Sequence, residues 1–279
     1  KELRNYPYDN LFSHVVGYST KGKIGVEEFC NYYLINSNIP LSEKVANTTA
    51  GVKNPGNNVY TTLDLDMQKA ADDAMGIYKG AIVVTEVSTG KMLALVSKPD
   101  FDPNEIVEIW DKLLVDKDSS VLMNRVTTGL YPPGSTFKMI TSLEYIRENP
   151  DTYDNYSYNC SGSYKKDNNT IRCYHNMKHN KVSFIKSFAK SCNTSFTNIG
   201  LSLDRGKFSE LLDTLLFNRE LGLDFVTAIS KTPVSEEISD EDMMQVSIGQ
   251  GTVQITPMHL NMITAAIAND GLLMRPYVV

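Results

Sequence analysis

The stretch Tyr131-Pro-Pro-Gly-Ser-Thr-Phe-Lys138 runs directly into the helical pattern Met139-Ile-Thr-Ser-Leu-Glu-Tyr-Ile-Arg147. Two prolines and a glycine predict a turn, and the apolar residues after it recur at the spacing of one helix face. Ser135 is therefore predicted at the start of a helix, where free backbone N–H groups stabilise negative charge. Lys138 follows one turn later, on the same face as Ser135.

Ser135 and Lys138 are the pair of residues that an acyl-serine enzyme needs. A serine hydroxyl is a weak nucleophile until a neighbouring base takes its proton. A lysine acts as that base when burial or a nearby cation lowers the pKa of its amine. The alternative is that Ser135 only caps the helix and Lys138 is a solvated helix residue, and a bare Ser-x-x-Lys pattern does not separate the two.

A second polar motif, Ser191-Cys-Asn193, lies 56 residues after Ser135. A helical pattern over residues 182–190 precedes it and predicts that a loop presents the motif. Ser-x-Asn alone is a common polar triplet. Its order and spacing after the Pro-Pro-Gly-Ser turn favour a place in the same site as Ser135.

The segments around these motifs predict a mixed fold. Residues 80–87 and 91–97 are two β-prone apolar runs joined by a short glycine-containing turn, which is typical of a hairpin. A helix is predicted over residues 67–78, with Asp64 or Asp66 as its cap. Helical patterns dominate after about residue 105, and the last helix is predicted to begin at Thr256 and Pro257. A hairpin followed by many helices indicates an α/β or α+β fold whose sheet is incomplete in this chain.

With these motifs in this order, the chain resembles a class B (monofunctional) penicillin-binding protein, a D,D-transpeptidase of the acyl-serine penicillin-recognising superfamily. Ser-x-x-Lys and Ser-x-Asn are two of that superfamily's three motifs. The resemblance extends over residues 59–279. The matching segments are residues 59–64, 80–96, 97–104, 124–125, 131–138, 191–196, 248–251 and 256–257.

The resemblance implies a penicillin-binding, serine β-lactamase-like transpeptidase fold, with a sheet flanked by helices. Residues 59–279 would be the transpeptidase domain without its C-terminal strands. Residues 1–58 would be the end of an N-terminal pedestal region and a linker, because residues 48–58 are polar and rich in Gly, Pro and Asn.

The resemblance also assigns chemistry. Ser135 would attack the penultimate D-Ala carbonyl of a peptidoglycan stem peptide, with Lys138 as general base and the Ser135 N–H as half of the oxyanion hole. Ser191 would relay a proton to the leaving amine, and Asn193 would bind the substrate backbone. β-Lactams would inhibit by acylating Ser135. Within the region of similarity, Gly249, Gln250 and Gly251 are predicted to bind substrate.

The third motif of the superfamily, Lys-Thr-Gly or Lys-Ser-Gly, does not follow Ser191 in this sequence. The most similar sequence is Lys231-Thr-Pro233, which has proline in place of glycine and precedes Gly249. We expect the motif, the second oxyanion donor and about three strands to lie beyond Val279, by the family's pattern. We therefore expect a polypeptide that ends at Val279 to be unstable and not to be acylated.

A group of cysteines and histidines lies between the two motifs. Cys160, Cys173, His175 and His179 have the spacing Cys-x12-Cys-x-His-x3-His, which fits a tetrahedral zinc site. A Cys160–Cys173 disulfide and four unrelated loop residues are the alternatives. The resemblance favours zinc, since some family members carry zinc near Ser-x-Asn, and it favours His179 over His175 as the ligand. Catalysis itself requires no cofactor, and Cys192 is predicted to be a packing residue.

The composition sets the remaining expectations. With 279 residues, 42% hydrophobic and 22% charged, the sequence is typical of a globular protein. A net charge of −6 without a basic run argues against a nucleic-acid partner. A serine β-lactamase, a D,D-carboxypeptidase and a non-catalytic β-lactam sensor or scaffold are the alternative functions.

The resemblance finally implies partners and a location. The partners would be stem peptides ending in D-Ala-D-Ala, β-lactam antibiotics, a glycosyltransferase, and divisome or elongasome proteins. The location would be the extracytoplasmic face of a bacterial cell membrane. No stretch of the sequence approaches the roughly 18 apolar residues of a membrane helix, so the anchor would be an N-terminal helix outside this chain.

Overall fold

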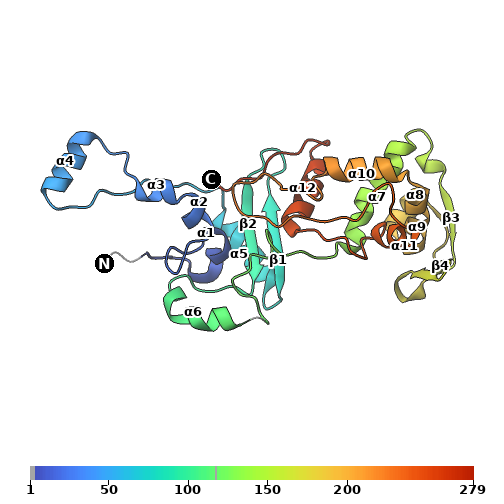
Figure 1. Ribbon diagram of the computed structural model, residues 1–279, viewed down its shortest axis with the longest axis horizontal. Helices are drawn as coiled ribbons and strands as arrows, with labels where there is room; N and C mark the ends of the chain where they lie inside the picture. Colours follow the sequence, from blue (N-terminus) through green and yellow to red (C-terminus); the bar gives the residue numbers. More distant parts are fainter. Residues whose placement is uncertain (1–3, 117) are drawn as a thin grey trace. The chain divides into compact units, whose positions relative to one another are not determined.

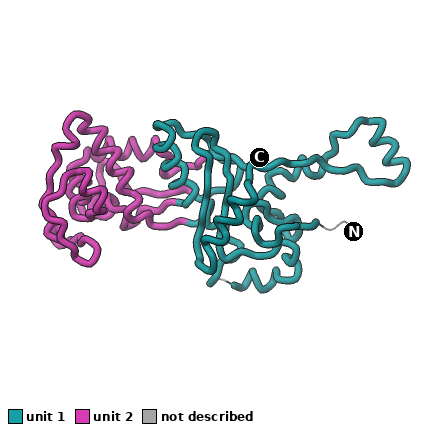
Figure 2. The backbone as a smooth tube through the Cα atoms, turned by 180° about the vertical axis from the view of Figure 1, so that it is seen from behind, with its two compact units in different colours: residues 1–129, 222–228, 256–279 teal, residues 130–221, 229–255 magenta. Residues whose placement is uncertain are grey.

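The computed structural model describes residues 4–116 and 118–279, which divide into two units. Unit 1 comprises residues 1–129, 222–228 and 256–279, and unit 2 comprises residues 130–221 and 229–255 (Figure 2). All residues of the predicted active site and of the predicted zinc site belong to unit 2. The predicted domain division at residue 58 falls inside unit 1 and stays a prediction.

Unit 1 is built around the predicted hairpin. Strands β1 (Gly80–Thr85) and β2 (Met92–Lys98) pair antiparallel, and helices α5 (Leu65–Met75) and α12 (Pro257–Ala268) contact them (Figure 1). Apolar residues of α5 and β2 form a small core between helix and hairpin: Ala71, Met75, Ala94 and Val96.

Two predicted helix caps of unit 1 are confirmed. Asp64 accepts a hydrogen bond from the Met67 N–H at the start of α5. Thr256 accepts one from the His259 N–H at the start of α12, with Pro257 in the first turn. Both side chains satisfy backbone donors that have no partner inside the helix.

The rest of unit 1 is made of short helices. Residues 26–35 form two helices, which are separated by the non-helical backbone of Cys30. The elements are η1 (Asp9–Phe12), α1 (Ser13–Val16), α2 (Val26–Phe29), α3 (Asn31–Ile35), α4 (Leu41–Thr49) and α6 (Ile106–Val115).

Unit 2 combines helices with two small antiparallel sheets. Strand β3 pairs with β6, and β4 pairs with β5. The strands are β3 (Ser157–Cys160), β4 (Ser163–Lys166), β5 (Asn169–Arg172) and β6 (Asn180–Ser183). The helical elements are η2 (Gly134–Phe137), α7 (Lys138–Glu148), η3 (Tyr153–Asn155), η4 (Tyr174–Asn176), α8 (Phe184–Ala189), α9 (Asn193–Ser202), α10 (Arg205–Thr214) and α11 (Asp240–Val246).

The prediction of a helix over residues 182–190 is wrong at its start. Val182 and Ser183 belong to β6, where buried Val182 pairs with Tyr158, and the helix begins at Phe184. The Ser183 side chain accepts a hydrogen bond from the Lys186 N–H and so caps α8. The expected dominance of helices after residue 105 also overlooked β3–β6, because four-residue strands with polar outer faces carry little apolar periodicity.

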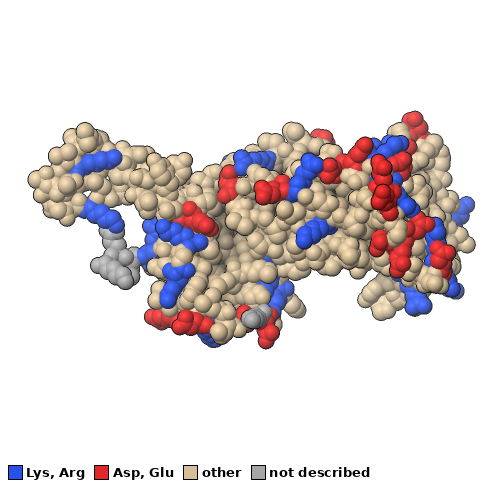
Figure 3. Space-filling model, viewed as in Figure 1, with Lys and Arg blue, Asp and Glu red and all other residues tan. Residues whose placement is uncertain are grey.

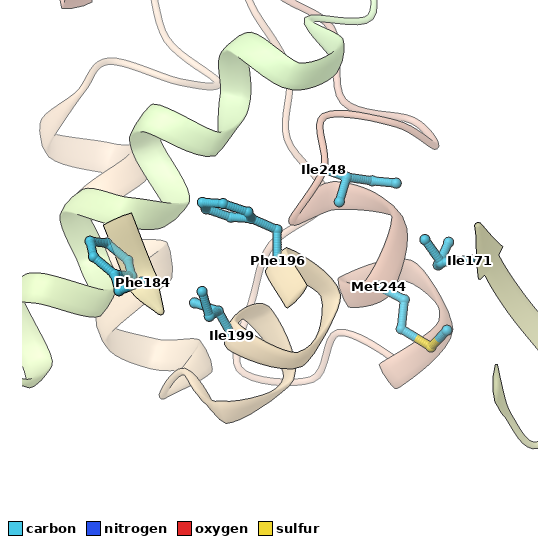
Figure 4. Packing of buried hydrophobic residues seen from close by; sticks show 6 residues of the cluster. All are labelled: Ile171, Phe184, Phe196, Ile199, Met244 and Ile248. Carbon is cyan, nitrogen blue, oxygen red and sulfur yellow. The ribbon is translucent and has the colours of Figure 1, made fainter. Parts of the chain in front are cut away.

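The core of unit 2 connects the segments that carry the predicted site. Figure 4 shows the buried apolar side chains of this core, which come from β5, α8, α9 and α11, together with Ile248 beyond α11. The cluster consists of Ile171, Phe184, Phe196, Ile199, Met244 and Ile248. Three of its members lie next to, or one helical turn from, site residues: Ile171 precedes Arg172, Phe196 follows Asn193 and Ile248 precedes Gly249.

Acidic and basic side chains are interspersed on the face of unit 2 drawn in Figure 3. Asp240 at the start of α11 forms ion pairs with both Lys166 and Arg205. Among the helices of residues 4–116 and 118–279, none has the length and hydropathy that a membrane span requires.

Candidate active site

The serine turn has the predicted conformation. Tyr131 forms backbone hydrogen bonds in both directions with Ile255, and Gly134 then adopts a positive φ of 57°. Element η2 begins at Gly134, and α7 continues from Lys138. Ser135 is exposed at this helix entry, while Phe137 and Ile140 are fully buried and anchor the same segment.

Ser135, Lys138 and Ser191 form a closed triangle of polar contacts. The Lys138 Nζ lies 2.9 Å from the Ser135 Oγ and 2.9 Å from the Ser191 Oγ. The two hydroxyl oxygens are themselves 2.9 Å apart. The structure therefore brings the Ser-x-x-Lys and Ser-x-Asn motifs into one site, as their order suggested.

Asn193 completes the surroundings of the lysine. Its Oδ1 accepts a hydrogen bond of 2.6 Å from the Lys138 Nζ, and its Nδ2 donates one of 3.0 Å to the Arg172 carbonyl oxygen. The Arg172 carbonyl thus fixes which end of the amide faces Lys138. No sequence pattern predicts this contact, because it joins β5 to the start of α9 through a backbone atom.

Lys138 is only 2% exposed, although its amine faces three polar side chains. Burial lowers the pKa of Lys138 from 10.5 to about 8, and the nearby thiols of Cys192 and Cys173 partly oppose this shift. Desolvation disfavours the charged ammonium, so a larger fraction of Lys138 is neutral near neutral pH than for an exposed lysine. A neutral amine can accept the proton of the Ser135 hydroxyl.

The Ser191 backbone is held in an uncommon conformation. Ser191 has a positive φ of 49°, and its N–H donates to the Phe188 carbonyl at 2.9 Å. The Cys192 N–H donates to the Ser187 carbonyl at 2.9 Å. Phe196, one turn into α9, is fully buried, and its ring centroid lies 5.8 Å from the Lys138 Nζ. These contacts fix the loop that presents Ser191 and Asn193.

Directly behind this loop lies a thiol cluster, formed by Cys160, Cys173, Cys192 and His179. One ligand atom from each of the four lies within 4.8 Å of all the others. The Sγ–Sγ distances are 3.7 Å from Cys160 to Cys173 and 3.8 Å from Cys173 to Cys192. The Cys160 Sγ lies 3.5 Å from the His179 Nδ1. All three cysteines are buried free thiols.

The structure adds one member to the predicted zinc set and leaves out another. Cys192, predicted to be a packing residue, is fully buried, but its thiol also belongs to the cluster. His175 is exposed and its ring packs on Tyr174, so His179 is the histidine of the cluster. Cys192 was visible in the sequence as the middle residue of Ser191-Cys-Asn193. It was not assigned to the metal set, because it lies far from Cys173 in the sequence.

The Thr194 hydroxyl lies against all three thiols, 3.2 Å from Cys160, 3.6 Å from Cys173 and 3.5 Å from Cys192. Burial opposes ionisation of Cys160, but hydrogen bonds from Thr194 and His179 lower the pKa of its thiol to about 6. Burial raises the pKa of the Cys192 thiol to about 12. The cluster therefore offers one ready thiolate, and a bound metal ion would deprotonate the others.

Gly249 and Gln250 lie beside the serine turn. The Gly249 carbonyl accepts a hydrogen bond of 2.8 Å from the Gly134 N–H. The Gln250 Nε2 would be 3.7 Å from a Cβ placed on Gly134. Gly251 instead faces the Gln245 side chain. Two of the three residues predicted to bind substrate are thus near Ser135.

Residues 80–279 match the family model described as the penicillin binding protein transpeptidase domain. The chain belongs to this family. The match covers the hairpin, the serine turn, the Ser191 loop and Gly249, so the predicted family is confirmed by the part of the sequence that forms the site.

Curated relatives agree with the family. The peptidoglycan D,D-transpeptidase PbpA of Mycolicibacterium smegmatis is 32% identical over 301 residues, which include 99% of this chain and 60% of the relative. The peptidoglycan D,D-transpeptidase MrdA of Escherichia coli K12 is 26% identical over 325 residues, with 99% and 51% covered. The chain thus spans between half and two thirds of the length of these relatives.

A solved structure confirms the predicted fold class. Penicillin-binding protein A from M. tuberculosis, as a penicillin G acyl-enzyme complex, superposes with a TM-score of 0.86 at 30% identity. The match covers 99% of this chain and 68% of that chain. The mixed helix and strand arrangement described above is therefore that of a penicillin-binding transpeptidase domain.

Proposed function

We propose that this chain acts as a peptidoglycan D,D-transpeptidase through an acyl-enzyme on Ser135. One observation carries the proposal. The Ser135 Oγ, the Lys138 Nζ and the Ser191 Oγ lie 2.9 Å from one another, and Lys138 is only 2% exposed. A nucleophile, a desolvated base and a second hydroxyl within hydrogen-bond reach are what acyl transfer from serine requires.

Acylation begins with a neutral Lys138. Its amine accepts the proton of the Ser135 hydroxyl while it donates hydrogen bonds to Ser191 and Asn193, and the Ser135 oxygen attacks the penultimate D-Ala carbonyl. The Ser135 N–H, at the start of η2, is one donor to the oxyanion. The oxyanion collapses, the bond to the terminal D-Ala breaks, and an acyl ester on Ser135 remains.

Proton transfer through Ser191 completes each half-reaction. The Ser191 Oγ lies within 2.9 Å of both Lys138 and Ser135, so it can pass the proton from the lysine ammonium to the amine of the departing D-Ala. In the second half-reaction an amine from a neighbouring stem peptide attacks the ester and returns its proton along the same path. Asn193, with its amide orientation set by Arg172, contacts the peptide backbone of the substrate.

The surroundings of the serine argue against a β-lactamase. Such an enzyme needs a group that activates water against the acyl ester, often a carboxylate. Among the described residues, the hydrogen-bond partners of Lys138 and Ser135 are hydroxyl, amide and backbone carbonyl oxygens, and none is a carboxylate. We therefore expect a long-lived acyl-enzyme, which fits a transpeptidase better than a β-lactamase.

The test uses the full-length protein, a synthetic donor peptide ending in D-Ala-D-Ala and a D-amino acid as acceptor. We expect mass spectrometry to detect exchange of the terminal D-Ala for the acceptor, with no exchange by Ser135→Ala. Release of D-Ala without exchange would instead indicate a D,D-carboxypeptidase. Rapid repeated turnover of a chromogenic cephalosporin would indicate a β-lactamase, and no reaction with either compound would indicate a sensor or scaffold.

A structural zinc ion in the thiol cluster is the second part of this proposal. A zinc–sulfur bond is about 2.3 Å long, so the edge of a tetrahedral site between two sulfurs is about 3.8 Å. Two Sγ–Sγ distances in the cluster, 3.7 and 3.8 Å, match this edge, and all four ligand atoms lie within 4.8 Å of one another. A disulfide would need its sulfurs at about 2.05 Å. Cys160, Cys173, Cys192 and His179 would hold the ion.

When bound, zinc would supply a fixed tetrahedral anchor behind the Ser191 loop. Elemental analysis should find about one zinc per chain, and alkylation of the native protein should spare the three cluster thiols. A mass lower by two hydrogens together with no metal would favour the Cys160–Cys173 disulfide.

The partners and the location follow from the same reaction. The substrates are stem peptides ending in D-Ala-D-Ala, and β-lactams acylate Ser135. A glycosyltransferase and divisome or elongasome proteins would supply and position the glycan strands. Because its substrates lie outside the cytoplasm, the protein acts at the extracytoplasmic face of a bacterial membrane, held there by a membrane anchor.

A further inference from the structure

Gly249 makes two close contacts with the residue before the nucleophile. Its carbonyl oxygen accepts a hydrogen bond of 2.8 Å from the Gly134 N–H. A Cβ added to Gly249 would lie 2.0 Å from the Gly134 carbonyl oxygen and 2.8 Å from the Gly134 N and C atoms. Both polar groups of the Gly134 backbone therefore lie against the backbone of Gly249.

These contacts affect Ser135 through the planar peptide group. The Gly134 carbonyl and the Ser135 N–H belong to the same peptide plane, so they can rotate only together. Ser135 is the second residue of η2, and its N–H has no partner within the helix. Displacement of the Gly134 oxygen therefore turns the N–H that faces the developing oxyanion.

The Gly249 turn is fixed independently of the serine. The Gly249 N–H donates to Val246 at 2.8 Å, and the Gln250 N–H donates to Gln245 at 2.9 Å. Ile248 is buried in the core cluster of Figure 4. Gly249 itself has a φ of 72°, which glycine adopts readily. The turn can therefore act as a rigid support for the serine turn.

We propose that Gly249 is a positioning residue for acyl transfer, whose carbonyl and bare α-carbon hold the Gly134–Ser135 peptide group in the orientation that binds the oxyanion. This role differs from the direct substrate contact expected from the sequence. The inference rests on the proposed acyl-serine function of Ser135. It predicts a defect in the chemical step and none in the preceding binding step.

Gly249→Ala in the full-length protein tests the proposal. Gly222→Ala is the matched control, because Gly222 has a similar φ of 65° but no heavy atom within 4 Å of an added Cβ. Both variants incur the same backbone strain, and only Gly249→Ala forces the Gly134 carbonyl to move. A third variant replaces Gly134 by glycolic acid, which removes the N–H donor to Gly249, makes the Pro133 carbonyl a weaker acceptor for the Thr136 hydroxyl, and adds no bulk.

Stopped-flow acylation by benzylpenicillin over a range of concentrations separates the dissociation constant from the first-order acylation rate. Removing an oxyanion donor typically costs about 10²–10³ in rate, so we expect the acylation rate of Gly249→Ala to fall by about 10². The dissociation constant should stay within about threefold, as for a change felt only in the transition state. Gly222→Ala should acylate like the wild type, and the glycolic acid variant should show a smaller fall of the same kind.

The outcomes are distinct. If wild-type protein is not acylated, the proposed function fails and this inference with it. If wild type is acylated and Gly249→Ala matches it, or loses rate only as much as Gly222→Ala, the positioning role is wrong and the proposed function stands. If Gly249→Ala does not fold, the glycolic acid variant decides, and an unchanged acylation rate there overturns the proposal.

Discussion

The serine site and the thiol cluster meet at Cys192, but the sequence encodes them in different ways. Ser135 and Lys138 are three residues apart at one helix start, so local helix geometry brings them together. The cluster takes its side chains from the end of β3, the residue after β5, the residue before β6 and the residue before α9. A catalytic pair within one turn is recognisable as a motif, whereas a dispersed ligand set becomes evident only after folding.

The two regions also differ in what burial does to them. Burial of Lys138 makes its amine more reactive and costs folding free energy, because a charged ammonium is desolvated. Burial keeps the Cys192 thiol protonated, whereas hydrogen bonds favour the Cys160 thiolate, whose counter-charge a metal ion would supply. We therefore expect burial of Lys138 to lower the stability of the fold. We expect a metal ion in the thiol cluster to stabilise the loop of Ser191, Cys192 and Asn193, which belongs to both regions.

The largest expected effect is that of Lys138→Met. Loss of a general base typically slows a reaction by about 10²–10⁴, and stopped-flow acylation by benzylpenicillin measures it. The thermal midpoint at pH 7 should rise, by roughly 2–4 °C per kcal/mol gained, because the desolvated ammonium is removed. An unchanged acylation rate would disprove the role of Lys138 as the base. A lower thermal midpoint would show that burial of Lys138 does not destabilise the fold, contrary to the comparison with the thiol cluster.

The pH dependence of acylation gives the next largest effect. Lys138 must be neutral to act, and burial lowers its pKa to about 8. The rate should therefore rise about tenfold per pH unit well below this value, or about 50-fold from pH 6 to 8, and level off above it. The same shift makes the fold more stable as pH rises from about 8 to 10.5, since the unfolded chain binds the extra proton there. A rate that is flat between pH 6 and 8 would contradict the account.

Cys192→Ser tests the thiol cluster against a matched cysteine. Cys30 is also a buried free thiol but lies outside the cluster, so Cys30→Ser is the control. Loss of a ligand should weaken zinc binding by more than the 10–100-fold typical of outer-shell changes, lower the thermal midpoint and make it insensitive to a chelator. Equal zinc content in both variants would exclude Cys192 as a ligand.

The thiol cluster is the part of the site that was least predictable from the sequence. Spacing identified Cys160, Cys173, His175 and His179, and the resemblance to the family favoured His179. The serine pair was identified because the Pro-Pro-Gly turn fixes the helix start. Cys192 and Thr194 were missed, because only the packing of α9 against β3 and β5 brings them to the other thiols.

The fold was predicted to a similar extent. The hairpin of β1 and β2 and the caps Asp64 and Thr256 follow from local rules, and they are confirmed. The last two residues of the short strand β6 were mistaken for helix, because Val182 directly precedes a segment in which Phe184 and Phe188 have helical spacing. The contact of Gly249 with Gly134 joins two backbones, which no side-chain pattern records.

Thr194→Val gives the smallest expected effect. The valine keeps the volume of the buried side chain and removes the hydroxyl, which lies 3.2 Å from the Cys160 Sγ. Without this hydrogen bond the pKa of the Cys160 thiol should rise, and zinc affinity should fall by about 10-fold, at the lower end of outer-shell effects. Competition with a chromogenic chelator measures the affinity. An unchanged value would mean that the hydroxyl only fills space.

Identification of the acylated residue tests the central claim most directly. The full-length protein is treated with benzylpenicillin, its intact mass is measured, and the modified peptide is sequenced. We predict one adduct per chain, located on Ser135, and no adduct in Ser135→Ala. An adduct on Ser191, or one that persists in Ser135→Ala, would contradict the assignment of Ser135 as the nucleophile and the mechanism built on it.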